Sequence, residues 1–153
     1  MTDIPDFESF SYDDAWTLGS AFAAECRADG LPMAIAIDLG EHRVFQAGLP
    51  GSTAMNARWA DRKANIVRHF DLASAEVAER YGAIDGFLTL FALDPREYAA
   101  AEGAIPIRVR GALVGVLAVS GLDAGGDHDL ALSALVRFHA SRPAFPADPD
   151  DPS

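Results

Sequence analysis

The stretch IPIRVRGALVGVLAVS, residues 105–120, decides the fold of this chain. In its first arm, residues 105–110, apolar side chains alternate with Arg108 and Arg110, which is the two-residue period of a strand with one buried face. Residues 113–120 are again rich in branched apolar side chains. Gly111 lies between the two runs, where a tight turn favours glycine. The stretch therefore predicts a β-hairpin that turns at Gly111.

A second hairpin is predicted earlier, from the β-rich runs 33–38 and 43–47 on either side of the turn LGEH, residues 39–42. Apolar side chains at three- and four-residue spacing predict helices around these hairpins. The expected helices cover residues 11–30, 54–70, 74–81 and 127–140. Two hairpins interleaved with helices predict an α+β fold, with an antiparallel sheet flanked by helices. Residues 86–93 fit a strand or a helix equally well, and residues 96–101 are expected to add a helical turn.

Several residues mark the ends of these helices. Ser11 is a good N-cap with Asp14 three residues later, and Gly30 suits the left-handed position after the last turn. Asp127 is expected to cap the last helix. The apolar stripe of the first helix includes Cys26, which we interpret as an inert buried thiol. The other members of that stripe are Tyr12, Ala15, Trp16, Gly19, Phe22 and Ala23.

The 153 residues suit a single domain, and their charge is concentrated at the two ends. The formal net charge is −11, from 23 acidic and 12 basic residues. Residues 1–14 hold five acidic residues and no basic one, whereas residues 15–141 are nearly balanced. We expect an acidic N-terminal segment, residues 1–10, a single domain over 11–141, and a flexible Pro/Asp-rich tail over 142–153. A body without a basic stripe is not typical of a nucleic-acid-binding protein.

Other classes of protein are also disfavoured. The longest apolar runs have the length of strands, so no membrane span is expected, and residues 1–14 do not resemble a signal peptide. A single cysteine fits a reducing compartment, so a cytoplasmic location is predicted. No metal site is predicted, because Cys26 stands alone and the four histidines lack ligand spacing.

The predicted helix 54–70 contains an anomaly in its apolar stripe. Met55, Trp59, Ile66 and Phe70 share one face, and the position between them is Arg62, with Lys63 beside it. A cation in such a place needs a partner, because an unpaired buried charge is prohibitively costly. One interpretation is that Arg62 and Lys63 hold a carboxylate or phosphate while Trp59 stacks on it. The other is an internal or intersubunit salt bridge, and the sequence leaves both open.

A second set of candidate residues surrounds the main hairpin. Gly103 before the first strand and Ser120 after the second permit close approach of a ligand or of a neighbouring strand. Asp127 and His128 open the last helix, where a neutral imidazole could ligate a metal or haem iron, or carry protons. The sequence contains none of the usual nucleophile, phosphate-loop or Cys-x-x-Cys motifs.

Several short motifs occur together and in order. They are Trp59-x-x-Arg62-Lys63, Leu93-Asp94-Pro95-x-x-Tyr98-Ala99, Ile105-Pro106-Ile107-x-Val109-x-Gly111, Gly115-x-Leu117-x-Val119-Ser120-Gly121-Leu122 and Asp127-His128. Over residues 11–140 the chain resembles the haem-degrading-domain family, the HbpS/GlcG-like group, and within it a cytosolic branch of no settled activity. The resemblance implies a profilin-like fold, an α/β/α sandwich, assembled as a homo-oligomer.

The resemblance also implies a site. Carried over from the family motifs, it consists of Trp59, Arg62, Lys63, Gly103, Ser120, Asp127 and His128. The branch shows a His-Gly-Gly-Ala loop before its Pro-Ile strand, but this chain has Ala101-Glu102-Gly103-Ala104, so that histidine is absent and an acid replaces one glycine. Any role of the family histidine in holding a ligand or iron, or in proton transfer, is therefore altered or lost here.

Three hypotheses for the function follow. The first is an oligomeric binding module for an anionic small ligand, with haem as the cofactor that family analogy supplies. The second is an enzyme of haem breakdown or related redox chemistry. The third is a structural or partner-binding protein without a small ligand, in which Arg62 and Lys63 join subunits.

Overall fold

The predicted hairpin forms the centre of a five-stranded sheet. A computed structural model describes residues 3–123 and 125–143. In it β4 (Ala104–Val109) and β5 (Ala112–Ser120) pair antiparallel and turn at Gly111, whose φ is +80°. The earlier hairpin, β2 (Ala34–Leu39) and β3 (His42–Gly48), is also present, and β2 pairs antiparallel with β5. The strand order is β1-β4-β5-β2-β3, which places β3 at one edge.

A short strand that the sequence analysis did not predict forms the other edge. In β1 (Asp6–Phe7), two residues pair parallel with the end of β4, so the sheet is mixed. Phe7 is buried in the core, and the Asp6 side chain accepts a hydrogen bond of 2.9 Å from the N–H of Gly111. Part of the acidic segment 1–10 thus belongs to the sheet. Two residues are too few to show the alternation by which a strand is recognised.

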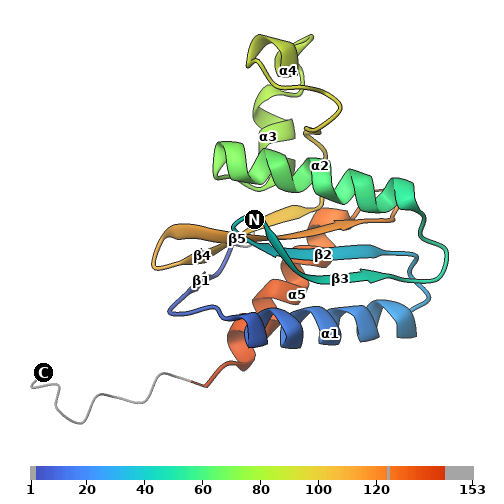
Figure 1. Cartoon of the computed structure of the whole chain (residues 1–153), viewed down its shortest axis with the longest axis vertical. Coiled ribbons are helices and arrows are strands. Elements are labelled where there is room, and N and C mark those ends of the chain that lie inside the picture. Colours follow the sequence, from blue (N-terminus) through green and yellow to red (C-terminus); the bar gives the residue numbers. More distant parts are fainter. Residues whose placement is uncertain (1–2, 124, 144–153) are drawn as a thin grey trace, which may run out of the picture.

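The helices cover both faces of the sheet (Figure 1). α1 (Tyr12–Ala28) and α5 (Asp127–Ser141) lie on one face, and α2 (Ala54–Phe70) lies on the other. The short helices α3 (Ser74–Tyr81) and α4 (Phe87–Leu90) form a projection beyond α2. This arrangement confirms the α+β sandwich, and α4 shows that residues 86–93 contain a helix rather than a strand.

The two faces of the sheet differ in the size of their side chains. The face toward α1 and α5 carries large aliphatic residues, including Ile35, Ile107 and Leu117. The face toward α2 is built from Ala104, Val116 and Ala118, which pack against alanines and Val67 of α2. Because these side chains are small, α2 packs closely on this face of the sheet.

Some expectations about individual segments were wrong. Tyr12 and Trp16 share the stripe of α1 but are largely exposed, because they lie beside the edge strand β3, where no further strand covers them. Residues 95–97 form a turn and not the start of a helix, since the Asp94 carboxylate accepts the N–H of Arg96 at 2.8 Å. Residues 144–153 of the expected tail lie outside the described residues.

The described residues contain neither a membrane-spanning helix nor a cluster of metal-ligating side chains. None of the helices there is both long enough and apolar enough to pass through a bilayer. In the same residues, no three His, Cys, Asp or Glu side chains come together as a metal site.

Candidate functional site

Helix α2 positions three of the seven candidate residues, Trp59, Arg62 and Lys63, and it begins at a well-formed N-terminus. Thr53 is the N-cap, and its N–H donates to the Asn56 side chain at 2.9 Å in a capping box. From this helix Lys63 extends toward the end of the sheet and α5, whereas Trp59 and Arg62 face the loop 94–97. The seven candidate residues therefore divide into two groups.

The first group surrounds Lys63, which is almost completely buried. Its Nζ donates to Asp127 Oδ2 at 3.1 Å and to the Val119 carbonyl at 3.0 Å. Asp127 is buried too, and its Oδ1 accepts the N–H of Leu122 at 3.0 Å. Burial lowers the pKa of Lys63 from its ordinary value, and the charges of Asp127 and Glu102 oppose that shift. The charges of Lys63 and Asp127 thus neutralise each other within the protein.

Gly103 makes room for this ion pair. Its φ of +128° belongs to the region that favours glycine, and a Cβ there would lie 2.5 Å from the Val119 oxygen and 2.9 Å from Lys63 Nζ. Ser120, which follows Val119 at the end of β5, is buried and pairs with Ala34 of β2. A close approach by a ligand or a neighbouring strand was expected at both residues. At Gly103 the groups that come close are the Lys63 side chain and β5, and at Ser120 it is the neighbouring strand β2.

The N-terminus of α5 differs from the prediction. Asp127 is not the cap but the first residue of the helix, because its carboxylate is occupied by Lys63 and Leu122. Glu102 caps the helix instead, and its Oε1 accepts the N–H of Gly126 at 2.5 Å and that of Asp127 at 3.2 Å. Glu102 was recognisable in the sequence only as a departure from the family loop, because no local pattern predicts its partners in α5.

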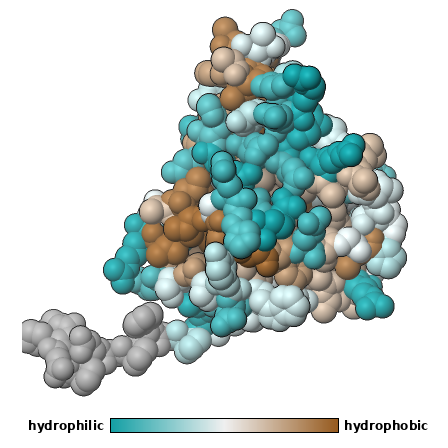
Figure 2. Space-filling view, in the orientation of Figure 1, coloured by the Kyte–Doolittle hydropathy of each residue, from teal (hydrophilic) through white to brown (hydrophobic). Residues whose placement is uncertain are grey.

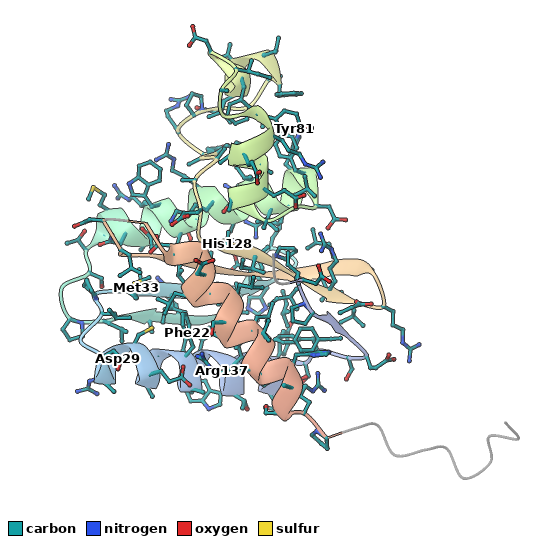
Figure 3. All side chains as sticks on the ribbon, turned by 180° about the vertical axis from the view of Figure 1, so that it is seen from behind. Phe22, Asp29, Met33, Tyr81, His128 and Arg137 are labelled. Atoms are coloured by element: carbon teal, nitrogen blue, oxygen red, sulfur yellow. The ribbon has the colours of Figure 1, made fainter. Side chains whose placement is uncertain are left out.

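His128 follows Asp127 at the end of α5 that lies nearest α2 (Figure 3). The side chain is half-buried, and among the described residues its Nδ1 is buried without a hydrogen-bond partner. His128 is not among the residues that line the cleft beside Arg62. In the chain His128 is next to Asp127, the residue that pairs with Lys63.

The second group is Trp59 and Arg62. The Arg62 guanidinium lies over the Trp59 ring, with Cζ 4.4 Å from the ring centroid, and one terminal nitrogen donates to the Pro95 carbonyl at 2.7 Å. Within the described part of the chain, Arg62 Nε is buried and has no acceptor. Arg62 is therefore held in place on two sides, yet one of its donors is unused.

A cleft of about 690 Å³ opens beside this pair. Arg58 and Met55 of α2 line it together with Trp59 and Arg62, and the loop 95–97 forms its other wall. Of the two acidic residues in its wall, Asp61 pairs with Arg43. Among the described residues, Arg58 and Arg62 pair with no carboxylate. Glu97, the other acidic residue in the wall, forms no ion pair among the described residues either, so the cleft combines an aromatic face with two unpaired arginines and one unpaired carboxylate.

Comparison with known proteins places the chain among relatives of similar length. A "UPF0303 protein" of Streptomyces avermitilis is 42% identical over 131 residues, which cover 84% of this chain and 80% of that protein. A UPF0303 protein of Mesorhizobium japonicum is 38% identical, over 84% of this chain and 78% of that protein. A crystal structure titled Ybr137w protein has a TM-score of 0.81 at 28% identity, over 90% of this chain and 83% of that one.

More distant structures share the fold. The crystal structure of HbpS has a TM-score of 0.66 at 18% identity, covering 92% of each chain. A structure titled PduOC:Heme Complex has a TM-score of 0.69 at 20% identity, over 84% of this chain and 94% of that one. The profile described as "Haem degrading protein HbpS-like" matches residues 10–136. Since that match covers most of the sequence, the chain belongs to the family of HbpS-like haem-degrading proteins.

Proposed function

We propose that this protein is a binding module for a flat, anionic small molecule, which it holds in the cleft beside Trp59 and Arg62. The observation that carries the proposal is the arrangement of Arg62, which is fixed over Trp59 while its buried Nε lacks a partner among the described residues. A ligand carboxylate in the cleft would accept from Arg62 and Arg58, and its ring system would contact Trp59. Such charge-assisted bonds are among the stronger polar contacts in proteins.

Haem is a ligand of this chemistry, and one structure of the same fold is described as a haem complex. The arginines and Trp59 suit its propionates and its flat face. Met55 brings a thioether to the cleft, but no histidine or cysteine is among the residues that line it. If bound, haem would supply iron redox chemistry. The protein residues account for holding the ring and its carboxylates, which supports binding rather than haem breakdown.

The test is titration with hemin and, in parallel, with protoporphyrin IX, which lacks iron. We expect a shifted Soret band for hemin and quenched Trp fluorescence for both ligands, with similar affinities. Arg62→Ala should weaken both affinities at least tenfold, which corresponds to about 1.4 kcal/mol. Arg27→Ala is the matched control, because Arg27 is exposed in the last turn of α1, away from the cleft. Equal binding by the wild type and Arg62→Ala would refute the proposal.

We also propose that the protein forms a homo-oligomer in the cytoplasm. Apolar side chains are exposed on the projection formed by α3 and α4, where Leu90 is 70% exposed and Ile84 and Phe91 about 40% (Figure 2). Exposed apolar side chains gathered on one part of a surface are typical of an interface between proteins. Light scattering of the purified protein tests this part of the proposal, and a monomer at micromolar concentration would contradict it.

A further inference from the structure

A second cavity, of about 500 Å³, lies between the first turns of α2 and the strands β2 and β3. The loop that joins β3 to α2, residues 49–53, lines one end of it. None of its lining residues belongs to the candidate site described above. Its size falls in the range typical of small-molecule sites.

Where β2 and α2 line this cavity, most of their lining residues are alanines. Ala34 and Ala36 of β2 face Ala57 and Ala60 of α2 across it. Facing surfaces of a sheet and a helix normally fill the space between them to the density of a crystal. The next turns of α2 do so, since Val67 packs against Val116 and Ala118. The space is therefore confined to the corner over β2 and β3.

A polar group on the edge of the cavity defines what it could hold. Arg43 lines the cavity, and its Nε donates to Asp38 Oδ1 at 2.6 Å, while one terminal nitrogen pairs with Asp61. Arg68 donates to the other oxygen of Asp38 at 3.1 Å. The cluster contains two cations and two carboxylates, so its net charge is zero. An anion would gain little from an arginine whose charge is already compensated.

Arg43 nevertheless keeps hydrogen-bond donors for a ligand. Its other terminal nitrogen donates one N–H to Gln46 Oε1 at 3.3 Å. Each terminal nitrogen of a guanidinium carries two N–H groups, so each has one left over within the described residues. The Gln46 amide nitrogen adds further donors at the same edge. The cavity thus combines alanine-rich walls with hydrogen-bond donors at its edge, and of these donors the Arg43 guanidinium is held by Asp38 and Asp61.

We infer that this cavity is a binding site for an uncharged small molecule with an apolar body and a carbonyl-type acceptor. The body would lie against the four alanines, and the acceptor would bond to Arg43 and Gln46. This site goes beyond the proposed anion cleft, because the charges beside it sum to zero and therefore favour an uncharged ligand over an anion.

The first experiment uses the neutral fluorescent ketone 6-propionyl-2-(dimethylamino)naphthalene, whose emission shifts to the blue in apolar surroundings. We expect saturable binding with such a shift. Ala57→Leu should weaken binding at least tenfold, because the larger side chain fills the cavity and leucine is well tolerated in a helix. Ala24→Leu, on the exposed face of α1, is the matched control and should bind as the wild type does. Absence of saturable binding, or equal binding by Ala57→Leu, would overturn the inference.

A second measurement tests the inference even if Ala57→Leu does not fold. In the wild type, the alanine methyl signals in a ¹³C-edited NMR spectrum should respond to the ketone at Ala34, Ala36, Ala57 and Ala60. Arg62→Ala should leave these changes intact, which separates this site from the anion cleft. The inference is overturned if the perturbed signals instead belong to Met55 and Trp59, or if the anionic 8-anilinonaphthalene-1-sulfonate displaces the ketone at equal concentration.

Discussion

Lys63 and Asp127 join the two layers of helices across the end of the sheet, with Lys63 Nζ 3.1 Å from Asp127 Oδ2. Lys63 belongs to α2 on one face, and Asp127 opens α5 on the other. Both side chains are nearly inaccessible to water. The pair lies beside Gly103 and Val119, so four segments that are distant in the sequence meet at one charge pair.

Removing one member of this pair should be costly. Asp127→Ala leaves a buried lysine without its counter-charge, and we expect a loss of about 3–5 kcal/mol in the free energy of unfolding. Urea denaturation followed by circular dichroism measures it. Glu76→Ala is the control, because the Glu76–Arg80 pair is exposed and should contribute about 0.5 kcal/mol or less. If Asp127→Ala lowers the free energy of unfolding no more than Glu76→Ala does, the buried pair does not make the expected contribution to stability.

The pH dependence of stability should show the lowered pKa of Lys63. Where the pKa of a lysine is lower in the folded state, the unfolded chain binds more protons just below pH 10.5, so stability rises with pH there. The stability of the wild type relative to Lys63→Met should therefore increase as the pH approaches 10.5. Urea midpoints for the two proteins over that alkaline range measure it. A difference that falls with pH would mean that the pairing with Asp127 outweighs the burial of Lys63.

Glu102 should behave as the cap of α5. Glu102→Ala removes the acceptor for the N–H groups of Gly126 and Asp127, and we expect a loss of about 1 kcal/mol, as for other N-caps. Glu102→Gln keeps an oxygen acceptor and should recover part of that loss. Thermal or urea unfolding of both variants gives the comparison. Equal stability of Glu102→Ala and the wild type would contradict a capping role.

Cys26 should be unreactive in the folded protein. Burial raises the pKa of its thiol to about 11, helped by the charges of Glu25 and Asp29 and opposed by Arg137. At pH 8 the fraction of thiolate is then about a hundredfold lower than for a thiol of ordinary pKa. Reaction with Ellman's reagent should accordingly be at least a hundredfold slower in buffer than in concentrated urea. Similar rates in the two conditions would show that Cys26 is accessible.

Local sequence patterns were sufficient to predict the elements that have a clear residue period or a turn glycine. The alternation in 105–110, the glycine at 111 and the three- and four-residue spacing in 54–70 predicted β4, the hairpin turn and α2. They were insufficient for β1, whose two residues form a strand only because Asp6 and Phe7 meet the end of β4. They also failed for Tyr12 and Trp16, whose exposure depends on where the sheet ends.

The candidate site was likewise predictable from local patterns only in part. The sequence by itself determined that the stripe of α2 carries one cation, Arg62, with a second, Lys63, next to it, because that anomaly is local to the helix. Only the tertiary structure decided their different partners: Lys63 meets Asp127, whereas Arg62 lies over Trp59 beside an open cleft. The two residues are adjacent, but successive positions on a helix are separated by about 100°. One therefore turns toward the end of the sheet and the other toward the loop 94–97, and no local pattern can specify what lies in either direction.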